Sequence, residues 1–379
     1  MAITEYYVSA AGGGSHDGSS EANALTFSEM VTQINGLGAG GGAGRRYNIK
    51  GAHTGRGATD TISVGGSATA PLILRGYNST IGDLDTGTRD AYGVLDTTNF
   101  PDLGYSSGFG LTFSAGYVVV MNLDIAPNRN TNGVSATLLF RIINCRVVNS
   151  NTGSSTVGLY AELASEIVNC DISSGASSGT AAMTIDETCH VVGCRVTSPG
   201  AIGIRMTGTA HTTIAGCTIY GCGGDGIGGT SAAGNKCFSN NTIYSCVDGI
   251  DIASGSTGAL AIVGNHITDC SGYGINFNGG TSGTAIVSGN RFRDNASGNT
   301  SGYADYVSGT SARNITTDAG GASTDYVDAA TNKDFRLITT AAGYRQGFAY
   351  NANIGACGDN ASSSGGVKVH PGVQGNING

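Results

Sequence analysis

The chain has 379 residues, of which 12% are charged, and its formal net charge is −8. A chain this poor in Lys and Arg does not fit a nucleic-acid-binding protein, because phosphate recognition needs clustered positive charge. A hydrophobic content of 39% excludes an intrinsically disordered chain, and no apolar run approaches the length of about 18 residues that spans a membrane. The 64 glycines follow no three-residue period, which excludes collagen.

The N-terminal residues are predicted to form a cap over residues 1–45. The chain opens with Met1-Ala-Ile-Thr-Glu-Tyr-Tyr, which lacks the positive and apolar regions of a secretory signal. Thr26 and Glu29 have the spacing of a helix capping box. One apolar face at helical spacing follows, formed by Phe27, Met30, Val31 and Ile34. We therefore expect a short amphipathic helix that covers one end of the fold, followed by a glycine-rich loop over 38–44.

A repeat of about 24 residues dominates the chain after this cap. Each copy has an anchor residue between apolar positions, as in Ile-Ile-Asn-Cys145-Arg-Val and Ile-Val-Asn-Cys170-Asp-Ile. The steps between anchors are 25, 24, 23, 24, 24 and 25 residues, and the anchors are Cys145, Cys170, Cys194, Cys217, Asn241, Asn265 and Asn290. A fixed period of this size is typical of a solenoid, in which each repeat stacks on the next.

Two more registers run in step with the anchors. The first is a small residue followed by an apolar one, at Gly158-Leu159, Ala182-Met183, Gly203-Ile204, Gly226-Ile227, Gly249-Ile250 and Gly274-Ile275. The second lies five residues after an anchor, at Cys222, Cys246, Cys270 and Asn295. Each repeat therefore holds short stretches of alternating polarity split by turn residues, which predicts three short strands and leaves no room for a helix.

These strands predict an all-β fold, a single-stranded parallel β-helix over residues 46–315. Successive coils would stack at the β-strand spacing of about 4.8 Å. Weaker coils are expected before the regular ones, at Tyr47-Asn-Ile-Lys and Pro71-Leu-Ile-Leu-Arg-Gly-Tyr. Beyond about residue 315 the period ends, so residues 316–359 are expected to close the far end and residues 360–379 to form a Gly/Ser-rich tail.

The coils and both flanking segments resemble the pectate-lyase-like superfamily of right-handed parallel β-helices, which includes phage tailspikes and fibres. The opening Tyr6-Tyr-Val-Ser-Ala-Ala-Gly-Gly-Gly-Ser-His-Asp-Gly-Ser-Ser-Glu21 is similar to the first segment of such proteins, and Lys333-Asp-Phe-Arg-Leu337 and Asn353-Ile-Gly-Ala356 are similar to their last. The resemblance implies right-handedness, and a homotrimer is the usual arrangement of the spikes. It selects no function, because this fold hosts lyases, hydrolases, epimerases and inert fibres.

The cysteine spacing indicates stacked columns inside the coils. Cys145, Cys170, Cys194 and Cys217 share one position of the repeat, and this column continues as Asn241, Asn265 and Asn290. Stacked Asn side chains hydrogen-bond along a column, and Cys behaves as a small buried hydrophobe. We expect reduced core cysteines in both columns. Disulfides between neighbouring coils and a metal site are the alternatives, although no CxxC or His pair supports a metal.

The position after each anchor is predicted to point outward. Arg146, Asp171 and Arg195 occupy it in successive coils and are expected to form a charge ladder on a solvated face. Two residues further on, Tyr220 and Tyr244 are expected to stack on neighbouring coils.

Polar side chains gather beside these two tyrosines. We predict a ligand-binding patch suited to sugars, formed by Tyr220, Tyr244, His266 and Arg293. If the protein is an enzyme, Asp269, Asp294 and Arg291 are the catalytic candidates, because two carboxylates one coil apart suit a retaining glycosidase. Ordinary surface acids explain the two aspartates as well.

Three further aspartates flank the Gly-apolar register. Asp225 and Asp248 are expected to point outward, with Asp251 nearby. The segment Gly223-Gly-Asp-Gly-Ile-Gly-Gly229 faintly resembles a Ca²⁺-binding nonapeptide, but a single copy at this period is interpreted as a turn. No metal site is predicted, and no cofactor is expected except Ca²⁺ under a lyase alternative.

The composition is typical of an extracellular protein, yet the sequence shows no secretory signal and the cysteines are expected to be reduced. A phage protein that is made in the host cytoplasm and released by lysis meets all three observations. We therefore expect a non-catalytic virion surface protein, a spike, fibre or capsid decoration, that serves adhesion to host surface glycans or decorates the particle. Its expected partners are identical subunits, other virion proteins and host polysaccharide, without nucleic acid or membrane insertion.

The main alternative is a depolymerase, either a polysaccharide lyase or a glycoside hydrolase. A lyase of this superfamily would need a Lys or Arg base near an acidic Ca²⁺ site, and a hydrolase would need two carboxylates at a defined separation. A structural or binding protein of a bacterial surface is a third reading. A concave face with three or more carboxylates and a base would favour the enzyme, and scattered charges would favour the spike.

Overall fold

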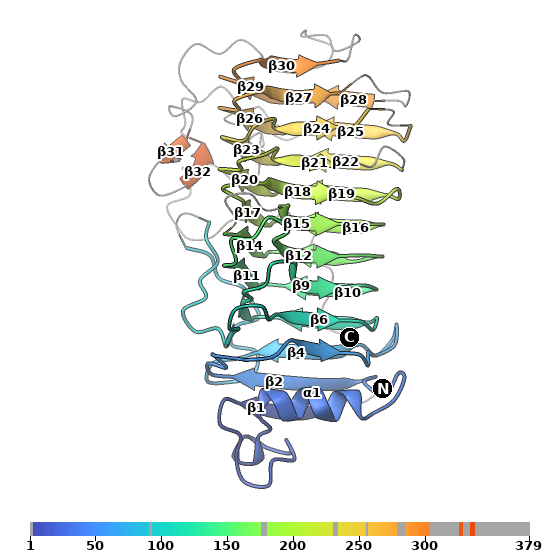
Figure 1. Ribbon diagram of the computed structural model, residues 1–379, viewed down its shortest axis with the longest axis vertical. Helices are drawn as coiled ribbons and strands as arrows, with labels where there is room; N and C mark the ends of the chain where they lie inside the picture. Colours follow the sequence, from blue (N-terminus) through green and yellow to red (C-terminus); the bar gives the residue numbers. More distant parts are fainter. Residues whose placement is uncertain are drawn as a thin grey trace.

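The computed structural model describes residues 3–90, 93–175, 180–229, 234–254, 257–278 and 285–302, together with the backbone of two further strands, β31 (Tyr326–Asp328) and β32 (Asp334–Leu337). Three long parallel sheets of 11, 9 and 10 strands run along the molecule (Figure 1). We name them sheets I, II and III in the order in which each coil passes through them. β31 and β32 pair with each other as an antiparallel two-stranded sheet.

The strands are short, and each sheet takes one strand from each coil. Sheet I contains β1 (Thr4–Ser9), β2 (Arg45–Lys50), β4 (Leu72–Gly76), β7 (Val118–Met121), β10 (Phe140–Ile143), β13 (Glu166–Val168), β16 (Cys189–Val192), β19 (Thr212–Ala215), β22 (Lys236–Ser239), β25 (Leu260–Val263) and β28 (Ala285–Ser288). Sheet II contains β5 (Asp102–Gly104), β8 (Asp124–Ala126), β11 (Arg146–Asn149), β14 (Asp171–Ser174), β17 (Arg195–Thr197), β20 (Thr218–Tyr220), β23 (Thr242–Tyr244), β26 (His266–Thr268) and β29 (Arg291–Arg293). Sheet III contains β3 (Asp60–Ile62), β6 (Leu111–Phe113), β9 (Asn132–Ala136), β12 (Val157–Ala161), β15 (Ala181–Ile185), β18 (Ile202–Met206), β21 (Ile227–Gly229), β24 (Ile250–Ile252), β27 (Tyr273–Phe277) and β30 (Gly298–Ser301).

This arrangement confirms the predicted parallel β-helix. Arg146 pairs with Asp171 and Asp171 with Arg195, so residues at one position of the repeat lie directly above one another. The weaker coils predicted near residues 47 and 72 are present as β2 and β4 of sheet I. The hydrophobic core runs inside the three sheets over their whole length, because every strand turns alternate residues inward.

The turn from sheet I to sheet II uses a residue with positive φ in successive coils. The residue just before each of the seven anchors has φ between 51° and 69°, and these residues are Asn144, Asn169, Gly193, Gly216, Asn240, Gly264 and Gly289. Asn122, at the same turn of the preceding coil, has φ of 60°. Asn and Gly tolerate this left-handed conformation better than other residues. Asn169 also donates from Nδ2 to Asn144 Oδ1 at 2.7 Å, so this turn carries a ladder of its own.

The small residue of the Gly-apolar register lies where each coil enters sheet III, either as the second residue of the strand or directly before its first. A Cβ atom at Gly249 would lie 2.2 Å from Ile267 Cγ2 and 2.5 Å from the Gly274 carbonyl oxygen. A Cβ atom at Gly226 would lie 2.6 Å from Ile243 Cγ2. The position therefore requires a small residue, because the isoleucine of the next coil fills the space that a larger side chain would need.

The anchor column forms the hydrogen-bonded ladder that the sequence predicts. Asn265 donates from Nδ2 to Asn290 Oδ1 at 2.9 Å and to the Phe238 carbonyl at 2.9 Å. Its own Oδ1 accepts from Asn241 Nδ2 at 3.0 Å. Where the column changes from Asn to Cys, the Cys217 backbone N–H donates to Asn241 Oδ1 at 2.9 Å. Each asparagine side chain thus satisfies a backbone carbonyl and a backbone N–H of the preceding coil.

The nine cysteines of the described residues are free, in agreement with the reduced columns expected from sequence. Burial raises the pKa of the Cys145 thiol to about 12, so this group stays protonated at neutral pH. The Cys194 Sγ donates to the Ile167 carbonyl at 3.5 Å, a weak hydrogen bond inside the core. The tenth cysteine, Cys357, lies outside the described residues.

A thiol-labelling experiment tests this state of the cysteines. In the native protein we expect a maleimide reagent to modify Cys237, which is only half-buried, and to leave eight others unmodified, because they are at most 5% exposed: Cys145, Cys170, Cys189, Cys194, Cys217, Cys222, Cys246 and Cys270. Peptide mapping by mass spectrometry reads each site separately. Labelling in denaturant without a reducing agent is the control, and a cysteine that stays unmodified there would reveal a disulfide.

The predicted cap is formed by α1 (Phe27–Asn35), preceded by a short 3₁₀ turn, η1 (Glu21–Asn23). The Thr26 backbone N–H donates to the Glu29 carboxylate at 2.7 Å, and the Glu29 N–H donates to Thr26 Oγ1 at 3.3 Å, which confirms the capping box. Phe27, Met30 and Ile34 are buried, and Val31 packs beside them half-buried. The helix crosses the end of the solenoid (Figure 1), where it covers the otherwise open apolar core.

The predicted closing segment 316–359 lies outside the described residues, except for the backbone of β31 and β32, and the tail 360–379 lies wholly outside them. Among the described helices, none has the length and apolarity needed to cross a bilayer.

Candidate functional site

Much of the outer face of sheet II is buried, which corrects the expected solvated charge ladder at Asp171 and Arg195, whereas the Arg146 side chain is 43% exposed. Asp171 and Arg195 are 9% and 6% exposed. Asp171 does not pair with its column neighbours: its Oδ1 accepts from Arg89 at 2.6 Å and its Oδ2 from the Leu95 backbone N–H at 2.8 Å. Arg89 and Leu95 belong to a loop over 77–100, whose described segments 77–90 and 93–100 contact this face through these two residues. Arg146 turns the other way and pairs with Asp124 at 2.7 Å.

The predicted ligand-binding patch also lies on sheet II. Tyr220 and Tyr244 are direct neighbours on adjacent strands and are half-buried, and the Arg195 guanidinium lies 4.5 Å from the centre of the Tyr220 ring. His266 is fully buried and accepts a hydrogen bond at Nε2 from the Arg291 guanidinium. Arg293 is 5% exposed. The structure therefore brings these residues together, but it places His266 and Arg293 away from any open surface.

The two predicted catalytic aspartates occupy turns rather than strands. Asp269 and Asp294 are exposed and have φ of 59° and 50°. In the preceding coils the same turn position is held by Gly221 and Ser245, with φ of 59° and 54°. Asp tolerates this left-handed conformation better than most residues, so the turn geometry alone accounts for both aspartates. The Arg291 side chain is fully buried and lies against His266.

Sheet III carries a row of polar side chains on its outer face. Each position of this row directly follows the apolar residue of the Gly-apolar register, and strand pairing aligns the positions across six strands. We call these residues the sheet III row: Tyr160, Thr184, Arg205, Gly228, Asp251 and Asn276. Four more carboxylates flank the row at the ends of its strands, from Glu162, Asp186, Asp225 and Asp248.

Three of these carboxylates interact with one another. The Asp248 backbone N–H donates to Asp225 Oδ1 at 3.2 Å, which holds Asp225 against the next coil. Burial, followed by repulsion from Asp225 and Asp248, raises the pKa of Asp251 to about 6. Burial also raises the pKa of Asp225, and the Asp248 carboxylate adds to that shift. Asp251 consequently exchanges its proton near neutral pH, a property of groups that bind cations or transfer protons.

Two groups in the row have unused hydrogen-bonding capacity. Thr184 is 4% exposed, and its Oγ1 has no hydrogen-bond partner among the described residues. Asp251 Oδ1 is also buried without such a partner. Asp248 is different, because its Oδ1 accepts from the Tyr273 N–H and its Oδ2 accepts from Asn276 Nδ2 at 2.9 Å. The row therefore combines satisfied groups with two that lack an internal partner.

The carboxylates do not converge on a metal. Over the described part of the chain, no group of three or more His, Cys, Asp or Glu side chains is arranged to hold an ion. Asp248 is fully engaged with Tyr273 and Asn276, and this leaves too few free oxygen ligands for Ca²⁺, which takes six to eight. The residues thus do not fit the Ca²⁺ site that a lyase would need.

The sequence contained a signal for this row that the prediction did not use. An outward position is predicted for Asp225 and Asp248, with Asp251 nearby, but Tyr160, Thr184, Arg205 and Asn276 are not included in that prediction. All four follow a Gly-apolar or Ala-apolar pair, so the second register already marks them as one outward column.

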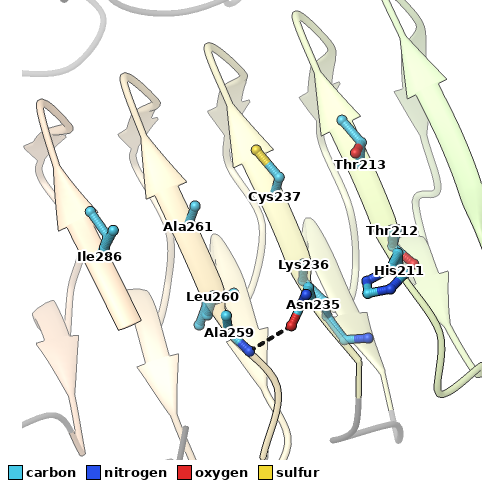
Figure 2. Close-up of a pocket in the computed structure, with 10 residues that line it drawn as sticks. All are labelled: His211, Thr212, Thr213, Asn235, Lys236, Cys237, Ala259, Leu260, Ala261 and Ile286. Carbon is cyan, nitrogen blue, oxygen red and sulfur yellow. Dashed lines mark hydrogen bonds between the residues drawn. The ribbon is translucent and has the colours of Figure 1, made fainter. Parts of the chain in front are cut away.

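Sheet I has a contrasting outer face. A shallow depression of about 310 Å³ lies over β19, β22, β25 and β28, and the row Thr213, Cys237, Ala261 and Ile286 crosses it (Figure 2). Its lining contains no carboxylate, and Ile286 is 58% exposed. Beyond the depression the same outward row becomes polar, with His190, Glu166 and Arg141, and the last two form an ion pair at 2.6 Å. Apolar outward residues occupy other positions of the sheet: Ile73, Val119, Met121, Ile143, Val168, Val192 and Val263.

Comparison with known proteins gives a family and a fold. The sequence model of the family described as "Right handed beta helix region" matches residues 130–319, which is half of the chain. Among solved structures, the crystal structure of pectate lyase Pel9A aligns with a TM-score of 0.66 and 17% identity, over 95% of this chain and 98% of that one. A rhamnogalacturonan lyase aligns with a TM-score of 0.50 and 15% identity, over 88% and 94%.

A third solved structure, ORF18 of Geobacillus virus E2, has a TM-score of 0.41 and 14% identity, over 68% of this chain and 51% of that one. None of the curated proteins matches the sequence. At identities of 17% and 15%, the two lyase structures show a shared fold alone.

Proposed function

The chain belongs to the family of right-handed β-helix regions, and on that premise we propose that it is a non-catalytic protein of a phage particle surface that binds glycans along the sheet III row. The observation that carries the binding site is the contrast between the three outer faces in the described part of the chain. Sheet I presents an apolar strip over β19 to β28, sheet II is largely covered, and sheet III presents four half-exposed polar side chains in one row, from Tyr160, Arg205, Asp251 and Asn276.

The composition of the row suits a sugar polymer. Arg205 and Asn276 supply N–H donors, Asp251 supplies acceptors, and Tyr160 supplies an aromatic ring. Coils repeat at about 4.8 Å, so the row is a linear array that an extended chain follows from coil to coil. Flat aromatic and planar polar groups of this kind pack on sugar rings while they satisfy hydroxyl groups.

The assignment to a particle surface is supported by the other two faces. The apolar strip of sheet I over β19 to β28 suits packing against identical subunits, and we propose a homotrimer built through it, attached to other particle proteins. The nine free cysteines of the described residues, eight of them buried, fit assembly in a reducing cytoplasm. A closed solenoid with a capped end supplies a rigid body for display at such a surface.

A glycoside hydrolase is the second candidate, and the sheet III carboxylates favour it specifically. Asp251, with a pKa raised to about 6, is suited to donate a proton near neutral pH, and Asp225 lies on the adjacent coil as a second carboxylate. In this scheme Asp251 would protonate the glycosidic oxygen. A lyase reaction is less well supported, because Gly228 separates Arg205 from Asp251 in the row.

One assay separates these functions. The purified protein is incubated with a panel of bacterial and algal polysaccharides, and both co-elution in size-exclusion chromatography and release of reducing ends are measured. We expect at least one glycan to co-elute with the protein without release of reducing ends. We expect Arg205→Ala to bind that glycan at least tenfold more weakly. Release that is lost in Asp251→Asn would establish the hydrolase instead, and no retention of any glycan would refute both.

A further inference from the structure

We propose that α1 is a cover that acid releases: the helix closes the end of the solenoid at neutral pH, and its N-terminal half detaches when the His53 side chain takes up a proton. The device consists of one buried histidine, the aromatic ring that it contacts and the charged groups around both. It lies at the capped end of the molecule, so it is independent of the sheet III row and of the proposed glycan binding.

His53 lies in the segment that connects β2 to β3, and its ring packs against the first residue of α1. The centres of the His53 and Phe27 rings lie 5.7 Å apart, with an angle of 57° between the ring planes. Both residues are buried, His53 with 5% and Phe27 with 1% of its surface exposed. The His53 backbone N–H donates to the Asp102 carbonyl at 2.6 Å. Because the backbone of His53 is anchored on β5 and its ring rests on α1, a displacement of the ring is passed to the start of the helix.

The surroundings of the His53 ring favour its neutral form. Nε2 is buried and has no hydrogen-bond partner among the described residues, so a proton added there would have no acceptor. The Arg56 guanidinium lies 4.5 Å from the centre of the same Phe27 ring, and its positive charge acts on His53. A protonated His53 would therefore be a buried cation beside a second cation, an arrangement that is costly without a carboxylate to offset it.

The carboxylates of the surrounding elements have other partners within the described part of the chain. Asp60 on β3 accepts from Arg56 Nε at 2.5 Å and from Arg56 Nη2 at 2.8 Å. Glu29 on α1 lies 2.9 Å from His16 Nδ1. Asp102 on β5 presents its carbonyl to His53, while its carboxylate belongs to the outward column of sheet II. Protonation of His53 thus finds its nearest carboxylates already engaged.

The sign of the pH dependence follows from the buried state of the ring. Burial lowers the pKa of His53 to about 4, and the Arg56 charge adds to this shift, although the Lys50 carbonyl opposes it. An exposed histidine has a pKa of about 6.5, so the open state binds the proton more tightly than the closed state. The closed cover is fully stable above about pH 7, and it loses stability as the pH falls from 6.5 to 4. By this linkage the open fraction should rise about 20-fold between pH 7 and pH 5.

A second ionisable contact of α1 responds at lower pH. Glu29 completes the capping box, and hydrogen bonds from His16 and Thr26 hold its pKa at about 2. Since this pKa lies below the ordinary value of a glutamate, the contribution of Glu29 is present above about pH 4.5 and is lost as the pH falls towards 2. Opening that begins near pH 6 therefore belongs to His53 and not to the capping box.

The two ends of α1 differ in how they are fastened. The N-terminal end rests on the contact between Phe27 and His53, which titrates. At the C-terminal end, Asn35 Nδ2 donates to the Thr61 carbonyl at 2.7 Å, and this hydrogen bond does not titrate. The helix should therefore hinge at its C-terminal end, and the opening uncovers the apolar end of the core that Phe27, Met30 and Ile34 close.

Hydrogen–deuterium exchange read by mass spectrometry at pH 7 and pH 5 tests the proposal, after correction for the intrinsic exchange rate at each pH. We expect the protection of the α1 amides to fall about 20-fold from pH 7 to pH 5, and that of the β15 amides in the middle of the solenoid to change less than threefold. Two variants remove the titrating ring: His53→Asn keeps a side-chain N–H donor, and His53→Phe keeps an aromatic contact with Phe27. In either variant the ratio of α1 protection at the two pH values should shrink to less than threefold.

His190→Asn is the matched control, because it removes a histidine from the exposed face of β16 and should respond to acid like the unsubstituted protein. Equal protection of α1 at pH 7 and pH 5 in the unsubstituted protein would overturn the proposal. It would also be overturned by a loss of protection that is equal in α1 and β15, or by an unchanged acid response in the His53 variant that folds.

Discussion

Replacing Gly249 by leucine is expected to abolish the folded protein. The Cβ atom alone would meet Ile267 Cγ2 at 2.2 Å and the Gly274 carbonyl oxygen at 2.5 Å, and the isoleucine is fully buried and unable to move aside. Overpacking a core costs about 1–3 kcal/mol for small additions, and here the added side chain also pushes apart two hydrogen-bonded coils. We expect Gly249→Ala to lower the melting temperature markedly and Gly249→Leu to yield no soluble protein.

The control for this prediction is Gly57→Ala. A Cβ atom at Gly57 meets nothing within 4 Å, so its melting temperature should stay within about a degree of the unsubstituted protein. Circular dichroism during heating measures each variant. If Gly249→Ala melted together with Gly57→Ala, the entry to sheet III would have room that the structure does not show.

The anchor ladder carries the second large effect. Asn265→Ala removes four side-chain hydrogen bonds from a fully buried site: two to Asn241, one to Asn290 and one to the Phe238 carbonyl. Each buried polar group left without a partner costs about 1–3 kcal/mol, so we expect a loss of at least ~3 kcal/mol. Asn265→Cys should lose less, because cysteine occupies the same column in four other coils and its thiol donates weakly to carbonyls.

Urea unfolding followed by fluorescence or circular dichroism measures this ladder. The surface variant Asn78→Ala is the matched control, since Asn78 is exposed, and its midpoint should be unchanged. The expected order of midpoints is the unsubstituted protein and Asn78→Ala first, then Asn265→Cys, then Asn265→Ala. Equal midpoints for the alanine and cysteine variants at position 265 would show that the hydrogen bonds add nothing beyond the packing.

The fold was accessible from sequence because each coil repeats the same steric demands. The anchor must be small and buried, the residue where each coil enters sheet III must lack a long side chain, and the turn before the anchor favours Asn or Gly. These demands recur every 23 to 25 residues, so alignment of Cys145 with Asn290 across six steps reveals them without a structure. The capping helix was equally legible, because Thr26 and Glu29 interact locally.

The candidate site was only partly accessible, because a repeat states which residues point outward and not what covers them. Arg146, Asp171 and Arg195 follow the outward column correctly, yet the loop over 77–100 buries Asp171 through Arg89, 82 residues earlier in the chain. That loop has no repeat of its own and no periodic signal. The sheet III row was missed because Tyr160, Thr184 and Arg205 differ in chemistry. Only their shared position in the repeat shows that they lie in one outward column.

The stacking direction of the strands has a mechanical consequence. In all three sheets the strands lie across the long axis (Figure 1), and the hydrogen bonds between neighbouring coils run along it. Tension along the axis therefore loads one layer of hydrogen bonds at a time and opens the coils in sequence from an end. Compression presses the same backbones into contact and distributes the load over three sheets. The molecule should therefore resist compression along its long axis better than it resists tension.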